Sequence, residues 1–168
     1  LQFERDELPG VDDKFIESHL TSAGQVEISL KYPDILPILY TCEAAAARQK
    51  VQETRGKVYG NNLELCAEAI QIRQQIATLL GHQHYADYIT TTRMTGEAKV
   101  VTEFLQSLQE KVQAAGKAEL ERLLAVKQAH MEARGEPFDG QLHSWDYGFY
   151  NEKLLKEQYG VDDSVIRE

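Results

Sequence analysis

Apolar residues recur at helical spacing along most of the chain after residue 33. One stripe consists of Leu65, Ala69, Ile72, Ile76 and Leu79. Two further stripes consist of Val101, Phe104, Leu105, Leu108 and Val112, and of Leu120, Leu123, Leu124 and Met131. Because a period of about 3.6 residues places such positions on one face of a helix, the pattern predicts long amphipathic helices.

Capping and turn residues predict where these helices begin and end. The sequence Gly60-Asn61-Asn62 predicts a turn, in which Asn61 or Asn62 caps the helix that follows. Gly81 follows the first stripe, where a left-handed C-cap is favoured. Thr95 is the candidate N-cap of the next long helix, and we expect a break in that helix at Gly116.

The same signals delimit the C-terminal part of the chain. Arg134-Gly135-Glu136-Pro137 ends the long helix, and a loop over residues 138–143 follows it. A last helix starts near Ser144 and is stopped by Gly160, and residues 161–168 predict a turn and another helix start. The positions of the last helix that should face the core are Trp145, Phe149 and Tyr150.

The N-terminal part has a strand signal. Val26, Ile28 and Leu30 alternate with polar residues, which is the only clear period of two in the chain. A single strand needs a hydrogen-bonding neighbour, because its backbone donors and acceptors must be satisfied. The neighbour is either the Gln2–Glu4 stretch or sequence outside this chain.

Shorter helices are predicted on both sides of this strand. Asp12 or Asp13 can cap a short helix that ends near residue 20. Pro33 suits the first turn of a helix, whereas Pro37 should end or kink it unless Pro37 also lies in the first turn. Residues 43–59 are rich in Ala, Arg, Gln and Lys, which favour a further helix.

These signals together predict a mainly α fold. We expect an antiparallel array of helices with short links, and at most one short strand or hairpin near residues 25–31. No internal repeat or low-complexity segment marks a boundary, so residues 1–168 are interpreted as a single helical segment.

Composition narrows the classes of partner. Lys and Arg number 18 and Asp and Glu number 27, and the resulting formal charge of −9 disfavours binding to nucleic acid. No run approaches the roughly 18 apolar residues of a membrane span, and we expect no signal peptide. Cys42 and Cys66 do not have metal-like spacing and favour a reducing compartment such as the cytosol, although one disulfide stays open.

The histidines do not form a recognisable metal site. The motif H-E-x-x-H, in which two His one helical turn apart face the same metal, is absent. His82 and His84 are the only close pair, and a surface or capping role is favoured over metal binding. His143 and Asp146 could form an acid–base pair, but we expect Asp146 to stabilise a helix N-terminus instead.

Other candidate groups also favour structural roles. Glu64 and Glu68 lie one turn apart, where a solvated helix face is favoured over a metal site. The aromatic residues around Trp145 could form a binding surface, but core packing is the more frequent role. A Gly-rich phosphate loop, a G-x-S-x-G elbow and a Cys–His nucleophile are absent. We therefore predict no catalytic, cofactor-binding or metal-binding residue in this segment.

An ordered series of short phrases resembles one protein family. The most informative phrases are Arg73–Gly81 and Ala86–Met94, although only the ordered set of phrases is specific. The phrases before them are Phe3, Glu7, Leu8, Gly10 and Phe15; Val26, Ser29–Pro33, Pro37, Leu39 and Cys42; and Arg48, Lys50 and Val51. The phrases after them are Val100, Phe104, Leu105 and Leu108; Lys127; Pro137–Gly140; and Trp145–Tyr147, Tyr150, Tyr159, Val161, Asp162 and Ile166. In this order they resemble the thimet oligopeptidase, neurolysin and saccharolysin family of zinc metallo-oligopeptidases.

The resemblance implies a parent enzyme with two helical lobes around a narrow channel that admits short peptides. It implies a zinc ion held by H-E-x-x-H and a later Glu, with the motif Glu as general base. This chain would lie upstream of that motif, form part of one wall, bind no zinc and be inactive alone. Leu1 is not an initiator Met, so we expect an excised or proteolysed piece or an experimentally chosen boundary, from a cytosolic or mitochondrial enzyme.

Three hypotheses follow. The first, a fragment of such a peptidase, predicts exposed apolar faces, contact with the remainder of the peptidase and self-association in isolation. The second is a helical scaffold or interaction module that is stable alone, has closed apolar faces and lacks enzymatic activity. The third places a ligand site at the His82–His84 turn and the Trp145 cluster.

Overall fold

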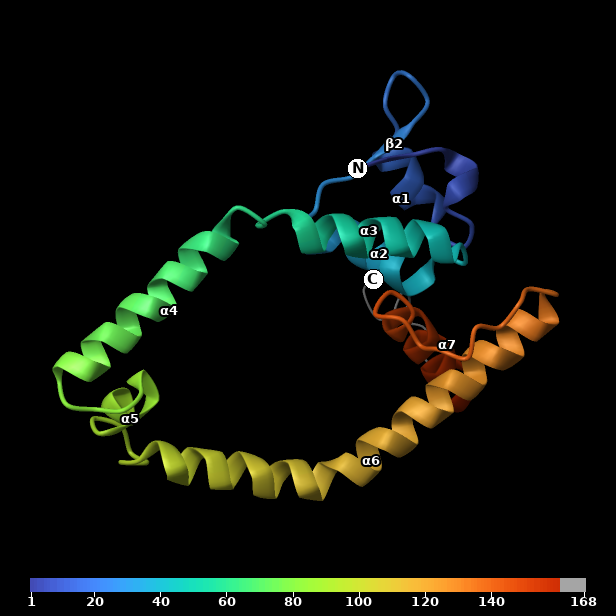
Figure 1. Ribbon diagram of the computed structural model, residues 1–168. Coiled ribbons are helices and arrows are strands. Elements are labelled where there is room, and N and C mark those ends of the chain that lie inside the picture. The colour runs from blue at the N-terminus through green and yellow to red at the C-terminus, as the bar shows by residue number, and fades with distance from the viewer. Residues whose placement is uncertain (161–168) are drawn as a thin grey trace. The chain divides into compact units, whose positions relative to one another are not determined.

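The computed structural model describes residues 1–160, which are mainly helical (Figure 1). Within them, seven α-helices, one short 3-10 helix and one two-stranded sheet follow one another along the chain. The predicted mainly α fold is confirmed. Among the described helices, none is long and apolar enough to cross a bilayer. The turn and helix start predicted for residues 161–168 lie outside the described residues.

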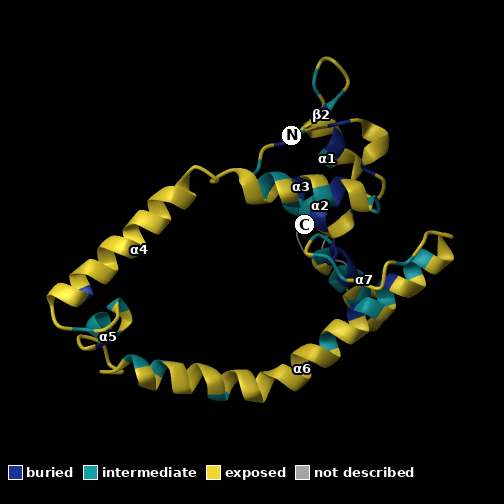
Figure 2. Cartoon of the chain, in the orientation of Figure 1, coloured by how far each residue is buried: buried dark blue, intermediate teal, exposed yellow. Residues whose placement is uncertain are grey.

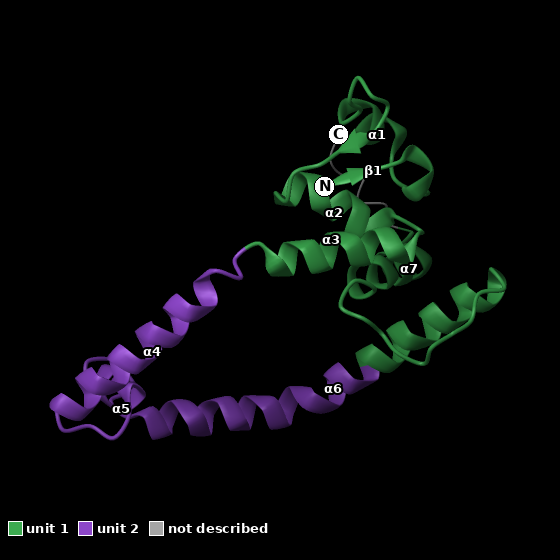
Figure 3. Cartoon of the chain, turned by 45° about the horizontal axis from the view of Figure 1, so that its top comes forward, with its two compact units in different colours: residues 1–58, 119–168 green, residues 59–118 purple. Residues whose placement is uncertain are grey.

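The chain divides into two compact units (Figure 3). Unit 1 consists of Leu1–Val58 and Glu119–Glu168, and unit 2 consists of Tyr59–Ala118. No internal boundary is predicted from the sequence. Helix α6, Ala98–Ala133, contributes to both units. Unit 1 is therefore built from two segments that are distant in sequence, and unit 2 from one continuous segment.

Unit 1 begins with a small antiparallel sheet. Strand β1, Gln2–Phe3, pairs with β2, Val26–Glu27, so that Phe3 lies opposite Val26. This pairing confirms the first of the two alternatives for the strand partner. The ladder is short, yet Val26 and Ile28 are both buried, as the alternating pattern predicts.

Two short helices lie between the strands. They are η1, Arg5–Glu7, and α1, Asp13–Ser18. The Asp12 carboxylate accepts a hydrogen bond from the backbone N–H of Phe15 at 3.1 Å, which confirms the predicted cap. Gly10 has φ of +87°, and a β-carbon there would lie 2.7 Å from the backbone oxygen of Thr41, so only glycine fits without displacement.

Helix α2 continues through its internal proline. It spans Tyr32–Thr41 with Pro33 in the first turn, as predicted. Of the two effects expected of Pro37, an end of the helix is wrong, whereas a kink stays a prediction. Pro37 removes one main-chain hydrogen bond from the helix. Burial of Ile35 and Ile38 on the inner face offsets that loss, since each side chain contributes about 1.5–3 kcal/mol when removed from water.

Helix α3, Ala45–Lys57, forms within the predicted range and completes the larger core. This core lies entirely in the first segment of unit 1. Its buried members are Phe3, Leu8, Val11, Ile16, Val26, Ile28, Ile35, Ile38, Leu39, Cys42, Ala47 and Val51.

Unit 2 contains α4, Asn62–Leu79, α5, Tyr85–Thr90, and the first part of α6. Gly81 has φ of +80°, which confirms the left-handed C-cap. Asn61 occupies the N-cap position of α4 but makes no capping hydrogen bond with its side chain. Ala77 and Thr90 are the only buried residues of residues 59–118, and most of this unit is exposed (Figure 2).

Helix α6 runs without a break for 36 residues. It begins three residues after Thr95 and passes through Gly116, so the predicted cap and the predicted break are both wrong. An internal glycine costs a helix about 1 kcal/mol relative to alanine, which a helix of this length absorbs. Gly135 follows the end of α6 with φ of +68°, as the turn signal predicts.

Helix α7, Tyr147–Tyr159, starts within three residues of the predicted position and ends at Gly160, whose φ is +62°. Phe149 and Tyr150 are buried, as predicted, and form a second core with Leu123 of α6. This core belongs to unit 1, where α7 also packs against α2.

Candidate functional site

Arg48 of α3 is a charged residue with only 1% of its surface exposed. Its guanidinium donates hydrogen bonds to the carbonyl oxygens of Cys42 at 2.7 Å and Trp145 at 3.1 Å. It also donates to a carboxylate oxygen of Asp146 at 2.8 Å and lies 4.1 Å from the ring centroid of Phe149. The planar guanidinium thus joins the start of α3 to the start of α7.

Asp146 lies at the N-cap of α7 and is 1% exposed. One of its carboxylate oxygens accepts the hydrogen bond from Arg48, and the other accepts from Lys127 Nζ at 2.9 Å. The second oxygen also accepts from the backbone N–H of His143 at 3.2 Å. A carboxylate is tolerated at this depth only because two cations and a backbone donor surround it.

Lys127 of α6 is the second buried cation, with 4% of its surface exposed. Its ammonium group donates to Asp146, to Asp139 at 3.0 Å and to the carbonyl oxygen of Gln141 at 2.7 Å. All three of its protons therefore have acceptors. Among residues 1–160, no buried side-chain nitrogen or oxygen lacks a hydrogen-bond partner. We call Arg48, Lys127 and Asp146 the buried charge network.

Asp139 and His143 form the outer edge of this network. The two side chains are 2.6 Å apart, and the His143 ring stacks on Trp145 with centroids 4.6 Å apart. The hydrogen bond from His143, followed by those from the Gln141 backbone and Lys127, holds the pKa of Asp139 well below its usual range. The loop between α6 and α7 is thereby attached to the network.

Glu43, which precedes α3, is the centre of a second polar cluster in unit 1. One carboxylate oxygen accepts from Arg134 at 2.9 Å and faces His130 Nε2 at 3.1 Å. The other accepts from Lys153 of α7 at 3.3 Å. Burial opposes ionisation of Glu43, but the charge of Lys153 and the hydrogen bonds from Lys153 and His130 lower its pKa overall.

His130 is held between this cluster and the second core. Its Nδ1 lies 3.3 Å from the hydroxyl of Tyr150, and its ring contacts Phe149. Burial, together with the charge of Lys153, lowers the pKa of His130 in spite of the neighbouring Glu43. Burial also raises the pKa of Tyr150. His130 is therefore neutral near pH 7 and can donate from one ring nitrogen while accepting at the other.

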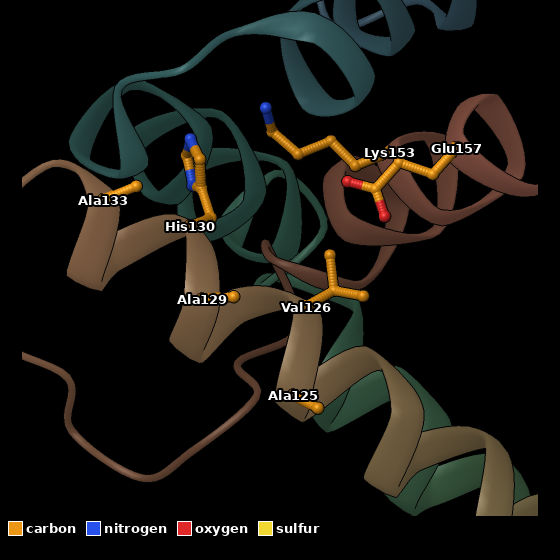
Figure 4. Close-up of a pocket in the computed structure, with 7 residues that line it drawn as sticks. All are labelled: Ala125, Val126, Ala129, His130, Ala133, Lys153 and Glu157. Atoms are coloured by element: carbon orange, nitrogen blue, oxygen red, sulfur yellow. The ribbon is translucent and has the colours of Figure 1, made fainter.

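His130 and Lys153 line a hollow of about 460 Å³ between α6 and α7 (Figure 4). Its lining residues are Ala125, Val126, Ala129, His130, Ala133, Lys153 and Glu157. Three of them are alanines on one face of α6, and Lys153 already pairs with Glu43. The hollow thus presents a small apolar floor with one imidazole and one carboxylate at its margins.

The structure separates the candidates that the sequence suggests. The His82 ring packs against Tyr88 with centroids 5.6 Å apart. The backbone N–H of His84 donates to Asp87 at the start of α5, which is a capping arrangement. The His143 side chain pairs with Asp139 and contacts Asp146 only through its backbone N–H. The acid–base pairing of His143 with Asp146 is therefore not formed.

The remaining candidates do not converge. Glu64 and Glu68 are exposed on α4. Within residues 1–160, no group of three or more His, Cys, Asp or Glu side chains is placed to hold a metal ion, so the described residues do not fit a zinc site. The statement that the whole segment binds no metal or cofactor stays a prediction, as does the absence of catalytic residues.

Comparison of the sequence with known proteins shows the family to which the chain is related. Residues 38–168 match the model of peptidase family M3. The chain belongs to this family. Over its whole length, this M3 chain is 26% identical to saccharolysin of Saccharomyces cerevisiae and 29% identical to thimet-like oligopeptidase of Dictyostelium discoideum. Over 96% of its length, it is 26% identical to oligopeptidase A of Haemophilus influenzae. The resemblance inferred from the sequence is confirmed.

The M3 chain spans about a quarter of the length of these relatives: 25% of saccharolysin, 26% of the thimet-like oligopeptidase and 25% of oligopeptidase A. The matched region includes the whole buried charge network and all of unit 2. Both structural regions therefore belong to what this chain shares with family M3.

The buried charge network is not predicted from the sequence. Arg48, Lys127, Asp139 and Asp146 lie in four separate phrases of the family resemblance, and the structure brings these phrases together. The available signal is that each of these phrases contains a charged residue, which in two of them, Pro137–Gly140 and Trp145–Tyr147, stands beside aromatic residues. Such a signal indicates that the residues matter, but it does not indicate which ones meet.

Proposed function

We propose that this chain is a non-catalytic helical part of a zinc-dependent metallo-oligopeptidase that hydrolyses short peptides. The zinc ligands and the general base lie in parts of the polypeptide outside residues 1–168, and the described helices support them as part of a wall. The observation that carries this proposal is the family M3 match over residues 38–168. The enzyme is assigned to the cytosol, with the mitochondrion as the alternative.

The chemistry of unit 1 supports a framework role. Its most buried charged residues pair with one another. One oxygen of the Asp146 carboxylate accepts a hydrogen bond from Arg48, and the other accepts from Lys127. Such a carboxylate cannot also act as a base toward a substrate, since its acceptor sites are occupied and shielded from solvent. The network instead fixes α3, α6 and α7 relative to one another within the unit.

The relatives support peptides as the substrate class. Two relatives of the M3 chain are named thimet-like oligopeptidase and oligopeptidase A, and the chain aligns with them over nearly all of its length. In zinc peptidases, a bound zinc ion supplies an activated water molecule and polarises the scissile carbonyl group. The part played by the present residues is to hold the helical scaffold rigid around a channel for short peptides.

The test compares the 168-residue chain with the longer polypeptide that carries it. Hydrolysis of quenched fluorescent peptides and zinc content by mass spectrometry are measured on both, with and without a zinc chelator. We expect no stoichiometric zinc and no turnover from the 168-residue chain. We expect chelator-sensitive cleavage of short peptides by the longer polypeptide.

Two results would overturn the proposal. One is stoichiometric zinc or chelator-sensitive turnover in highly purified 168-residue chain, because the segment would then contain the centre itself. The other is a correctly folded longer polypeptide that binds zinc but cleaves no short peptide. The alternative is a stand-alone scaffold. In that case, the 168-residue chain would not be part of any longer polypeptide with peptidase activity.

A further inference from the structure

Helix α4 is apolar on two separate faces. The first face carries Leu65, Ala69, Ile72, Ile76 and Leu79, and the second carries Leu63, Cys66, Ile70 and Ala77. At about 100° per residue, the centres of these faces lie roughly 130° apart around the helix axis. An amphipathic helix on a protein surface needs only one apolar stripe, so the second face of α4 requires its own explanation.

Both faces of α4 are exposed in this chain. On the first face, Leu65 is 62% and Leu79 is 86% exposed, and on the second face Leu63 is 72% and Ile70 is 65% exposed. Ala77, near the end that α5 contacts, is the only buried residue of the helix. Figure 2 shows the same distribution, with α4 exposed along almost its whole length. Exposed apolar surface on this scale marks a contact with other protein.

The polar side of α4 carries little charge. Glu64, Glu68 and Arg73 are its only charged residues in 18 positions, and its other polar side chains are mainly glutamine. A helix that faces water on most of its circumference usually carries many charged residues. The composition of α4 is instead that of a helix with one narrow polar side and two faces covered by other apolar elements, so its partner is an apolar protein surface.

On the basis of the proposed function, we propose that α4 is covered on two sides in the longer peptidase. Both of its apolar faces are covered by parts of the same polypeptide that lie outside residues 1–168. The family match runs through all of α4, while the chain spans only about a quarter of its relatives' length. A family member of the relatives' length therefore contains a large amount of further polypeptide that can cover this helix.

A second copy of the chain is the competing occupant. A two-fold dimer brings one self-complementary patch against itself, so a single such contact covers one face of each α4. The other face, roughly 130° away, would still be exposed to water. Two covering layers within one polypeptide satisfy both faces, and this difference favours the longer chain over a dimer.

Cys66 provides a native reporter for the second face. It is exposed on α4, whereas Cys42 is buried in the core of unit 1 and serves as an internal control. The rate of alkylation is measured by mass spectrometry of the peptide that contains each cysteine. In the longer polypeptide, we expect Cys66 to react on the order of 100-fold more slowly than in the 168-residue chain, because reaction requires local opening. Cys42 should be protected in both.

Two introduced cysteines complete the test. Ile72→Cys reports on the first face and should show the same protection in the longer polypeptide as Cys66. Gln71→Cys lies on the opposite, polar side and should remain reactive in both proteins. Both variants are compared at several protein concentrations.

Equal Cys66 reactivity in the two proteins would overturn the inference. Protection of Cys66 in the 168-residue chain would also overturn it. Protection that is independent of protein concentration would show that the chain itself covers this face, and protection that rises with concentration would show that a second copy covers it. Thiol protection needs neither zinc nor turnover. Protected thiols in a longer polypeptide without peptidase activity would therefore contradict the proposed function while leaving this inference intact.

Discussion

Units 1 and 2 are both helical and both carry amphipathic patterns, but they differ in what happens to the apolar faces. Unit 1 buries its apolar side chains in two cores, whereas residues 59–118 bury only Ala77 and Thr90. Phe104 and Leu105 of α6 are more than half exposed, although the same helix buries Leu123 completely. A stripe of apolar residues therefore specifies a helix, whereas burial of that stripe depends on which other parts of the polypeptide pack against it.

The two units also differ in how they use charge. Unit 1 places Arg48, Lys127 and Asp146 in its interior and satisfies each of them. In unit 2, the ion pair between Lys99 and Glu103 lies on the exposed surface of α6. Incorrect packing of a buried network is strongly destabilising, because a lost partner leaves an uncompensated buried charge. An exposed ion pair contributes little to the free energy of unfolding.

Removing the shared carboxylate should produce the largest effect. Asp146→Ala leaves Arg48 and Lys127 buried without their common counter-charge, and we expect a loss of about 3–5 kcal/mol in the free energy of unfolding. Asp13→Ala is the matched control, because the Asp13 carboxylate pairs with Arg5 on the surface, and it should cost less than about 1 kcal/mol. Urea unfolding measures both. Similar small losses would show that the network does not stabilise unit 1.

The next effect compares one substitution at two sites on α6. Leu123→Ala removes a side chain that is completely buried in the second core, and we expect a loss of about 2–5 kcal/mol. Leu105→Ala removes an exposed side chain of unit 2 and should change the stability of the 168-residue chain by less than about 0.5 kcal/mol. Thermal unfolding monitored by circular dichroism tests this contrast, which would fail if both variants lost the same stability.

Acidification should weaken unit 1 in two stages. The folded state lowers the pKa of His130, so protonation favours unfolding as pH falls below about 6.5, the ordinary value for histidine. The folded state also lowers the pKa values of Glu43 and Asp139, whose stabilising contribution is lost only at more acidic pH. The urea midpoint should therefore fall with pH, and His130→Gln should remove the first stage alone. An unchanged profile in that variant would assign the first stage to another group.

The smallest effect tests the internal glycine of α6. Nothing lies within 4 Å of the position that a β-carbon would occupy at Gly116, so Gly116→Ala should stabilise the chain by about 0.5–1 kcal/mol. Gly148→Ala is the control of opposite sign, because its β-carbon would lie 2.5 Å from the Tyr40 ring. Differential scanning calorimetry distinguishes the two. Destabilisation by Gly116→Ala would indicate that the helix requires flexibility there.

Local signals correctly predict most of the helix ends, but they also predict interruptions within helices that do not occur. Gly81, Gly135 and Gly160 all have positive φ at predicted stops, because an L side chain is disfavoured there and the preference is local. The sequence also predicts an end or a kink at Pro37 and a break at Gly116, but both helices continue past these residues. Their local cost is about 1–3 kcal/mol, and packing in α2 or the great length of α6 outweighs it.

The candidate site was not accessible to local reasoning. The sequence suggests His143, three residues away, as the partner of Asp146, whereas the side chains that pair with Asp146 are 19 and 98 residues away. Charged residues at such separations show no periodicity and no fixed spacing, so one sequence gives no sign that they meet. The aromatic positions Phe149 and Tyr150 were predicted as core, because their burial follows from helical periodicity alone.

The sequence separation of 98 residues from Arg48 to Asp146 also has a consequence for biosynthesis. At translation rates of about 5–20 residues per second, Arg48 is added to the chain roughly 5–20 seconds before its carboxylate partner. Unit 2, Tyr59–Ala118, is made within that interval, while unit 1 is still incomplete. Assembly of unit 1 is therefore a late event in synthesis, because its second segment, from Glu119 on, is made after the whole of unit 2.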